Sequence, residues 1–121
     1  MEEIPIFKFE DLIVYQKALD FVELAYEVSN DFPKSELYNL TSQFKRAAVS
    51  IPLNIAEGSG DTNAQFNRFL EIAAGSVKEC VVCSSIAMRQ NFISKEKDYQ
   101  NRERLAELSK MISSLKKYLK S

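Results

Sequence analysis

The chain has 121 residues, of which 45% are hydrophobic and 27% are charged, and its formal net charge is −1. That length suits one domain with a core of its own, and the near-neutral total argues against a dedicated nucleic-acid-binding protein. The sequence contains only three glycines and three prolines, which favours long helices joined by short connections. We therefore treat residues 1–121 as a single all-α domain.

The sequence also argues against secretion and membrane insertion. Its first twelve residues are acidic and lack the basic and apolar regions of a signal peptide, and no apolar run approaches the roughly 18 residues that cross a bilayer. Two cysteines do not make the disulfide framework of a small secreted protein. These features predict a cytoplasmic protein that does not contact a membrane.

Charge is distributed unevenly along the chain. Residues 1–36 carry three basic and nine acidic side chains, whereas residues 95–121 carry eight basic and four acidic ones. The simplest interpretation places an acidic first helix beside a basic last helix, within or between subunits. A local basic patch on the last helix is the alternative.

A first helix is predicted at about residues 10–31, where two apolar stripes follow a 3-4 spacing. One stripe is Leu12, Tyr15, Leu19, Val22 and Tyr26, and the other is Val14, Ala18, Phe21, Ala25 and Val28. Together they make an apolar face wider than one bundle core requires. The surplus predicts a second burial surface against another subunit.

A second helix is predicted at about residues 36–57, with Ser35 as its N-cap after Pro33. Pro52 should kink this helix, because proline lacks the N–H that would bond to the carbonyl of Ala48. The segment Gly58-Ser59-Gly60 should close the helix with residues that tolerate positive φ. The expected inward residues are Leu37, Leu40, Phe44, Ala47, Ala48, Ile51 and Ile55.

Two further helices are predicted at about residues 62–91 and 95–119. Thr62 with Gln65 matches a capping box, and Ser94 should cap the last helix. The third helix has a stripe of small residues that permits close approach of a neighbour: Ala73, Ser76, Cys80, Cys83 and Ala87. The fourth repeats Leu105, Leu108, Ile112, Leu115 and Leu119. Four such helices with short loops predict an antiparallel up-down-up-down four-helix bundle.

No catalytic machinery is recognisable in the sequence. Histidine is absent, which removes the commonest general base and the commonest zinc and haem ligand. Cys80 and Cys83 form a C-x-x-C in mid-helix, away from a helix N-terminus that would lower the thiol pKa, so two small core or interface residues are favoured over a redox pair. Glu57, Glu71 and Glu79 can face inward, but nothing in their spacing selects a metal. We expect no enzymatic activity and no cofactor.

Polar side chains recur at intervals of three and four along the second helix. They are Gln43, Arg46, Ser50, Asn54 and Glu57. Ser76 and Glu79 on the third helix are one turn apart and can meet this stripe. A buried network of this kind must be complete, because each unsatisfied polar group costs about 1–3 kcal/mol. We favour a structural network that sets helix register over the alternative, a surface that contacts a ligand or RNA.

The segment QFKRAAVSIPLNIAEG at 43–58 resembles the signature of bacterial four-helix-bundle proteins encoded within intervening sequences of 23S ribosomal RNA genes. Similar matches are FEDLIVYQKA at 9–18, FPKSELYNLTSQ at 32–43 and FNRFLEIAAGSVKE at 66–79. Tyr15 departs from the family, which often has Trp there. The most characteristic positions, for which the family has no established catalytic role, are Arg46, Ser50, Asn54, Glu57, Gly58 and Glu79.

This resemblance implies a bundle that assembles as a ring, expected to be a homopentamer. The chain is also similar to the accessory proteins of diversity-generating retroelements, which share the bundle and the ring. Those proteins bind a reverse transcriptase and RNA through basic surfaces. By this analogy the partner is structured RNA or an enzyme that acts on nucleic acid.

The leading hypothesis is a non-enzymatic oligomeric scaffold that binds RNA or a nucleoprotein partner. Its expected RNA or partner contacts are Arg102, Arg104, Lys110, Lys116, Lys117 and Lys120. The alternative is a protein-interaction or assembly module without a nucleic-acid partner, which the near-neutral charge favours. A third reading, a bundle that binds a small molecule or metal, lacks the ligand residues it needs.

Overall fold

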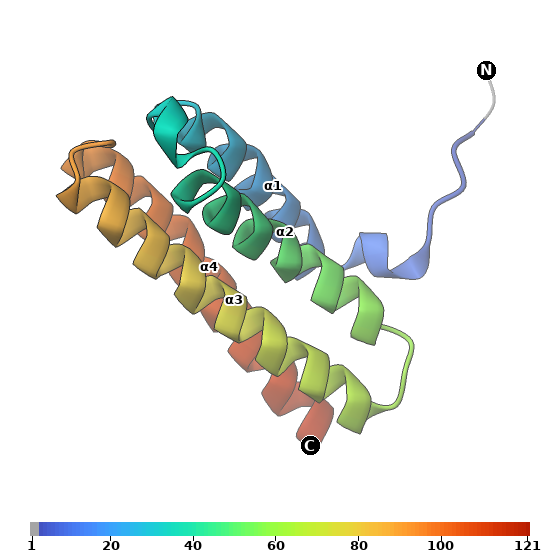
Figure 1. The fold of residues 1–121 in the computed structure, drawn as a ribbon. Coiled ribbons are helices and arrows are strands. Elements are labelled where there is room, and N and C mark those ends of the chain that lie inside the picture. The colour runs from blue at the N-terminus through green and yellow to red at the C-terminus, as the bar shows by residue number, and fades with distance from the viewer. Residues whose placement is uncertain (1–2) are drawn as a thin grey trace.

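The computed structural model describes residues 3–121, which form four long helices and no strand (Figure 1). The helices are α1 (Ile13–Ser29), α2 (Leu40–Gly58), α3 (Asn63–Arg89) and α4 (Lys95–Lys120). Two short 3-10 helices accompany them: η1 (Lys8–Asp11) before α1, and η2 (Lys34–Glu36) between α1 and α2.

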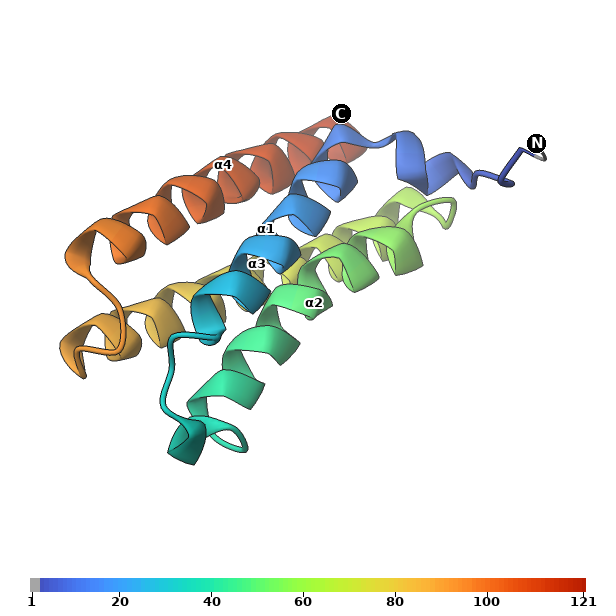
Figure 2. The same cartoon turned by 90° about the horizontal axis from the view of Figure 1, so that it is seen from above.

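Each long helix packs against two neighbours, in the order α1, α2, α3, α4 and back to α1. Successive helices run in opposite directions (Figure 1), and a view from above shows α1 between α4 and α2 (Figure 2). Across residues 3–121, neither diagonal pair of helices is in contact. The fold is therefore the predicted up-down-up-down four-helix bundle.

The first two helices begin later than predicted, because side-chain hydrogen bonds set their starts. The Glu10 carboxylate accepts a hydrogen bond from the Phe7 N–H at 2.8 Å and closes η1, after which Leu12 is extended and α1 begins at Ile13. Asn39 is non-helical, with φ −128° and ψ −104°, so α2 begins at Leu40.

The predicted cap at Ser35 is also wrong, since this residue lies within η2. Glu36 takes the capping role instead. Its Oε1 accepts hydrogen bonds from the Asn39 side chain at 3.1 Å and from the Leu40 N–H at 3.3 Å. Leu37, which was predicted to face inward, is half-exposed because it precedes the helix.

The caps predicted at Thr62 and Ser94 are confirmed, but the second hydrogen bond of the capping box is not formed, because the Thr62 N–H donates to Asp61 Oδ1 at 2.8 Å. Thr62 Oγ1 accepts a hydrogen bond from the Gln65 N–H at 3.2 Å, and Ser94 Oγ accepts one from the Lys97 N–H at 3.1 Å. The C-terminal end of α3 is closed by a Schellman motif, in which Asn91 has φ +63° and the Phe92 N–H donates to the Ala87 carbonyl at 2.8 Å.

The core uses one of the two apolar stripes of α1. Val14, Ala18, Phe21, Ala25 and Val28 are buried. In the other stripe, Leu19 and Tyr26 remain 41% and 47% exposed. Phe21 meets Phe44 edge-on at 6.2 Å between ring centroids, and the small-residue stripe of α3 is buried along its whole length. Leu12, Tyr15 and Val22 of the same stripe are partly buried against the core, so the apolar surplus of α1 is confined to Leu19 and Tyr26.

The expected adjacency of α1 and α4 is confirmed, but not through the expected charges. Lys17 of α1 forms an ion pair with Glu107 of α4 at 3.4 Å, so the base lies on the acidic helix and the acid on the basic helix. Both side chains are largely solvated, so this pair contributes at most about 1 kcal/mol. The excess of acidic side chains in residues 1–36 and of basic side chains in residues 95–121 is therefore not neutralised by pairing between α1 and α4.

Gly58 has a different role from the one predicted. Positive φ occurs at Gly60, at +86°, and not at Gly58. A Cβ built on Gly58 would lie 2.9 Å from both Phe66 Cδ1 and Phe69 Cβ. Gly58 is therefore needed for the close approach of α2 to α3. Pro52 is buried within α2 and does not interrupt the helix.

Gly58→Ala should destabilise the bundle by about 1–3 kcal/mol, because the added methyl group overpacks the α2–α3 connection. Gly75→Ala is the matched control, since a Cβ there meets nothing within 4 Å. In mid-helix that change should stabilise the protein by about 0.5–1 kcal/mol. Urea unfolding followed by circular dichroism measures both effects, and equal stabilities for the two variants would contradict the assignment.

Candidate functional site

The predicted polar stripe opens into a groove of about 530 Å³ between α2 and α3. We call this the α2–α3 polar groove. Five of the stripe residues singled out from the sequence line it: Gln43, Arg46, Ser50, Ser76 and Glu79. The 3-4 spacing places the α2 members on one face, and α3 brings the other two opposite them.

Three of the predicted residues form a hydrogen-bonded network beside this groove, and two of them, Ser50 and Ser76, line it. The Ser76 hydroxyl donates to Ser50 Oγ at 2.9 Å, which joins α3 to α2. Asn54 Nδ2 donates to the Ser50 carbonyl at 2.8 Å and to Ser50 Oγ at 2.9 Å. This network links the two helices at one height and so restricts how they can slide past each other.

The charged members of the stripe do not enter the network. Arg46, Glu57 and Glu79 are exposed, and within residues 3–121 no ion pair shorter than 4.0 Å involves any of them. Arg46 and Glu79 both line the polar groove and carry opposite charges. Gly58 is buried at the far end of α2, away from the groove.

Between α3 and α4 lies a buried polar cluster that the sequence analysis missed. The Ser84 hydroxyl donates to Asp98 Oδ1 at 2.6 Å, and Asn101 Nδ2 donates to Ser84 Oγ at 3.0 Å. Arg102 Nε donates to Asp98 Oδ2 at 2.9 Å, and its Nη2 donates to the Ser85 hydroxyl. The signal was available, because the 3-4 repeat of α4 extends backwards from the leucines to positions 101 and 98.

This cluster changes the interpretation of Arg102, one of the six basic residues expected to contact RNA. Its guanidinium is committed to Asp98 and Ser85, which anchors α4 to α3. The other five residues do not form one continuous surface on α4. Lys116, Lys117 and Lys120 line a groove of about 320 Å³ near the C-terminal end of the helix, whereas Lys110 lies at the α1–α4 seam.

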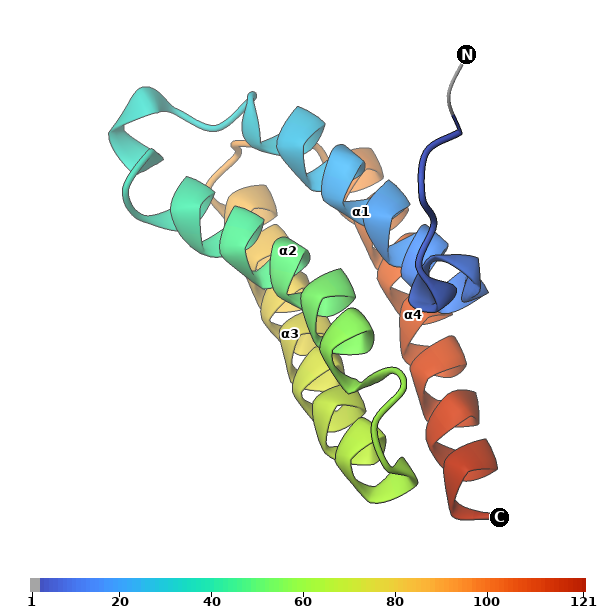
Figure 3. The same ribbon diagram turned by 90° about the vertical axis from the view of Figure 1, so that its right-hand side faces the viewer.

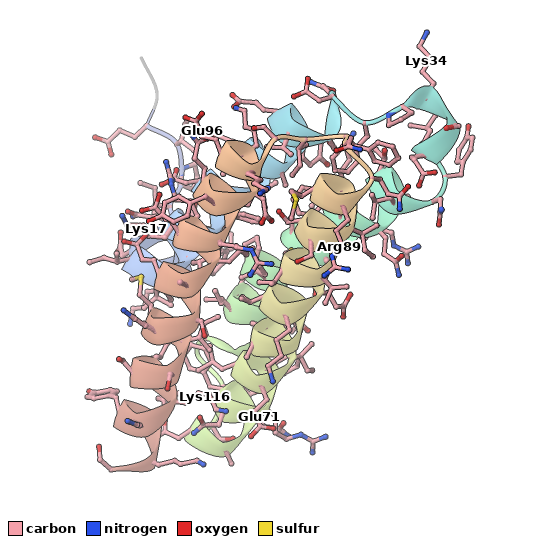
Figure 4. The ribbon with its side chains drawn as sticks, turned by 90° about the vertical axis from the view of Figure 1, so that its left-hand side faces the viewer. Lys17, Lys34, Glu71, Arg89, Glu96 and Lys116 are labelled. Carbon is pink, nitrogen blue, oxygen red and sulfur yellow. The ribbon has the colours of Figure 1, made fainter. Side chains whose placement is uncertain are left out.

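The lysines near the end of α4 have little competition from acidic groups. Lys116 Nζ lies 3.9 Å from Glu71 Oε1 on α3 (Figure 4). A pair at that distance with a largely solvated carboxylate is weak. Lys117 and Lys120 have no ion-pair partner within 4.0 Å in the part of the chain that the structure describes.

An apolar surface lies on the outer side of α1 and α2, which we call the α1–α2 apolar face. It consists of Tyr26, Val49 and Leu53, of which Leu53 is 62% exposed, and α1 adds the exposed Leu19. A groove of about 310 Å³ runs between Tyr26 and the α2 residues. The Lys45 ammonium sits 4.7 Å from the Tyr26 ring centroid, where the ring face attracts a cation.

Comparison with known proteins identifies the family. Residues 10–114 match the family described as 23S rRNA-intervening sequence protein. The chain belongs to this family. A protein of unknown function from the S23 ribosomal protein family of Bacteroides thetaiotaomicron VPI-5482 has the same fold, with a TM-score of 0.80 and 22% identity over 87% of this chain and 99% of that chain. Comparison with curated proteins finds no match.

The family match confirms the resemblance to the rRNA-intervening-sequence proteins, and the similarity to the retroelement accessory proteins stays a prediction. In this family member, the segment 43–58 that carries the resemblance forms most of α2. It supplies the α2 side of the polar groove and the close contact at Gly58. No helix within residues 3–121 is long and apolar enough to span a membrane.

The C-x-x-C cysteines are buried on α3, and both thiols are free. Burial raises the pKa of Cys80 and of Cys83, and the nearby Glu79 carboxylate raises both further. A reactive thiol needs the opposite shift. Among residues 3–121, no three Cys, Asp or Glu side chains gather as metal ligands.

We expect both thiols to react slowly with iodoacetamide in the folded protein, even at pH 9.0, where a thiol with the ordinary pKa of 9.0 is about half ionised. After unfolding in urea, both should react as fast as free cysteine. Mass spectrometry of timed samples measures the modification. Rapid labelling of the folded chain, or an intramolecular disulfide after mild oxidation, would contradict the structural role.

Proposed function

We propose that this protein is a non-enzymatic four-helix bundle that self-associates and serves as a scaffold for RNA or a nucleoprotein partner. The observation that carries the proposal is the α1–α2 apolar face, which no other part of the described chain covers. The family resemblance supports a closed ring, and a homopentamer is the size it implies. The lysines at the end of α4 supply the candidate contacts to RNA.

The α1–α2 apolar face favours self-association for an energetic reason. Fully burying a large apolar side chain stabilises a complex by about 1.5–3 kcal/mol relative to leaving it in water. Leu19, Tyr26 and Leu53 are all more than 40% exposed and come from two adjacent helices. Tyr26 and Leu53 line one groove, and a shared exposed apolar surface of this kind marks interaction sites in folded proteins.

RNA binding is supported by the lysines near the C-terminal end of α4. Lys116, Lys117 and Lys120 follow a spacing of one and three, so they lie close together and line one groove. Ammonium groups clustered in this way release counterions when they contact phosphates, which drives nucleic-acid binding. Arg104 is exposed and can extend the contact, whereas Arg102 contributes mainly to the packing of α4.

The commitment of Arg102 to Asp98 favours a second candidate function, assembly without nucleic acid. With Arg102 engaged and Glu71 close to Lys116, the basic surface of a single copy is small. Under this alternative, the apolar face and the polar groove bind protein partners. The RNA experiment described below separates the two functions.

Leu53→Asp should dissociate the assembly, because it places a charge in the centre of the apolar face that copies of the chain bury. Light scattering should then return the 13.8 kDa monomer, with an unchanged helical circular dichroism spectrum. Tyr118→Asp is the control, since Tyr118 is similarly exposed but lies near the C-terminal end of α4, away from this face. A monomeric native protein at micromolar concentration would refute self-association.

Replacing Lys116, Lys117 and Lys120 with Gln should weaken binding to structured RNA and reduce the slope of log affinity against log salt by about 2–3. Lys95→Gln/Lys97→Gln is the matched control, since both of these lysines are exposed at the opposite end of α4. Filter binding at several salt concentrations measures the effect. If the native protein shows no salt-sensitive binding below micromolar levels, RNA is not the partner and assembly alone remains.

A further inference from the structure

Residues 3–7, which we call the arm, leave the bundle in an extended conformation (Figures 1 and 3). Ile4 and Ile6 are 82% and 70% exposed, and Phe7 is exposed as well. Pro5 stands between the two isoleucines and favours an extended backbone on both sides. Three apolar side chains in a short segment are therefore exposed to water, and exposed apolar surface of this kind marks an interaction site.

The root of the arm is fixed. Besides the hydrogen bond from its N–H to Glu10, Phe7 packs its ring 6.0 Å from that of Phe9. Phe9 in turn meets the Tyr15 ring edge-on at 5.1 Å. The arm therefore projects in a defined direction from the start of α1. Ile4 and Ile6, two residues apart, lie on the same side of an extended segment, about 7 Å from each other.

A groove of about 510 Å³ runs between α3 and α4, and we call it the α3–α4 groove. Val77 and Leu105 are buried at its floor, and Val82 is a more than half-exposed wall. Lys78 and Arg102 stand at its rim. Its lining is mostly apolar, and because Arg102 is already held by Asp98, Lys78 is the base that suits a short apolar segment with a negative charge.

The arm cannot reach this groove on its own chain. The arm leaves from η1, which packs on α1 and α2, whereas the groove is lined by residues of α3 and α4 on the other side of the bundle. Five extended residues span at most about 18 Å. Crossing two helix diameters takes about 20 Å, before the arm enters the groove. Any arm that fills the groove must come from another copy.

We propose that residues 3–7 of one copy dock in the α3–α4 groove of a second copy, with Ile4 and Ile6 against Val77, Val82 and Leu105. Glu3 then lies near Lys78, which has no ion-pair partner within 4.0 Å in residues 3–121. This contact rests on the self-association proposed above, and it adds the α3–α4 groove to the α1–α2 apolar face as a second surface of the assembly. The two surfaces differ, so the contact is heterologous and repeats from copy to copy until a ring closes.

The α1–α2 apolar face fits the same arrangement. It lies on the side of the bundle from which the arm departs, opposite the α3–α4 groove. A copy that extends its arm to a neighbour therefore turns its own α1–α2 apolar face towards that neighbour. One association buries the apolar face, the arm and the groove together.

A charge exchange tests the contact in the full-length chain. Glu3→Lys and Lys78→Glu should each raise the concentration for half-dissociation at least about tenfold, because each places like charges together. The double variant Glu3→Lys/Lys78→Glu should recover most of the native association. The control is the double variant Glu3→Lys/Lys8→Glu. Lys8→Glu makes the same change of charge at an exposed position outside the groove, so this pair should give no recovery. Equal recovery in both pairs would overturn the contact.

Cross-linking separates this inference from the proposed function. In Ile4→Cys/Val82→Cys, mild oxidation should give a ladder of covalent oligomers, since each copy donates one arm and accepts another. The two single variants should stay uncross-linked, because the native thiols are buried. If the double variant associates by light scattering but does not cross-link, the arm does not occupy this groove and self-association stands. If light scattering shows that the double variant and the native protein are both monomers, the arm contact and the proposed self-association are both wrong.

Discussion

The close approach of α2 to α3 is the constraint on which the rest of the bundle depends. A hydroxyl-to-hydroxyl bond between Ser50 and Ser76 forms only when two helices come near enough for side chains of one carbon to meet. The buried small residues of α3 permit that distance, and Gly58 permits the tight connection beside Phe66. Because short side chains fill this seam, a polar groove remains open along its outer edge.

Polar contacts then set the heights of the helices, which apolar packing alone specifies poorly. Ser50, Asn54 and Ser76 fix α2 against α3, and the Ser84–Asp98 pair fixes α3 against α4. The second contact involves a carboxylate in a mostly buried position, which is stable there because it accepts hydrogen bonds from a hydroxyl and a guanidinium. The α1–α4 seam has the solvated Lys17–Glu107 pair instead. The register of the bundle is therefore defined mainly by α3.

Hydrophobic periodicity was sufficient to predict the bundle and most of its core, because the 3-4 repeats of α3 and α4 are long and their caps are local. The starts of α1 and α2 were not predictable in this way. They depend on Glu10 and Glu36, whose side chains bond to nearby backbone N–H groups and hold short 3-10 turns. The polar groove followed from spacing. The α3–α4 cluster was missed because Asp98 and Asn101, although they continue the 3-4 repeat of α4, are polar residues where such a repeat normally has apolar ones. Spacing also predicted that Arg46 and Glu79 lie on facing sides of the polar groove, but it could not show that the two side chains form no ion pair.

The proposed role as a scaffold for RNA has to be reconciled with a nearly neutral chain, and the division of the surface allows this. The two surfaces assigned to assembly lie on opposite sides of the bundle, while Lys116, Lys117 and Lys120 lie near the C-terminal end of α4. In a ring built by one repeated contact, every copy presents that lysine cluster at the same end. The positive potential then depends on the number of copies and not on the net charge of one chain. Several weak clusters held at fixed spacing bind one RNA with an avidity that a single cluster lacks. In the proposed function, RNA binding therefore depends on assembly, because a single cluster of three lysines binds RNA weakly.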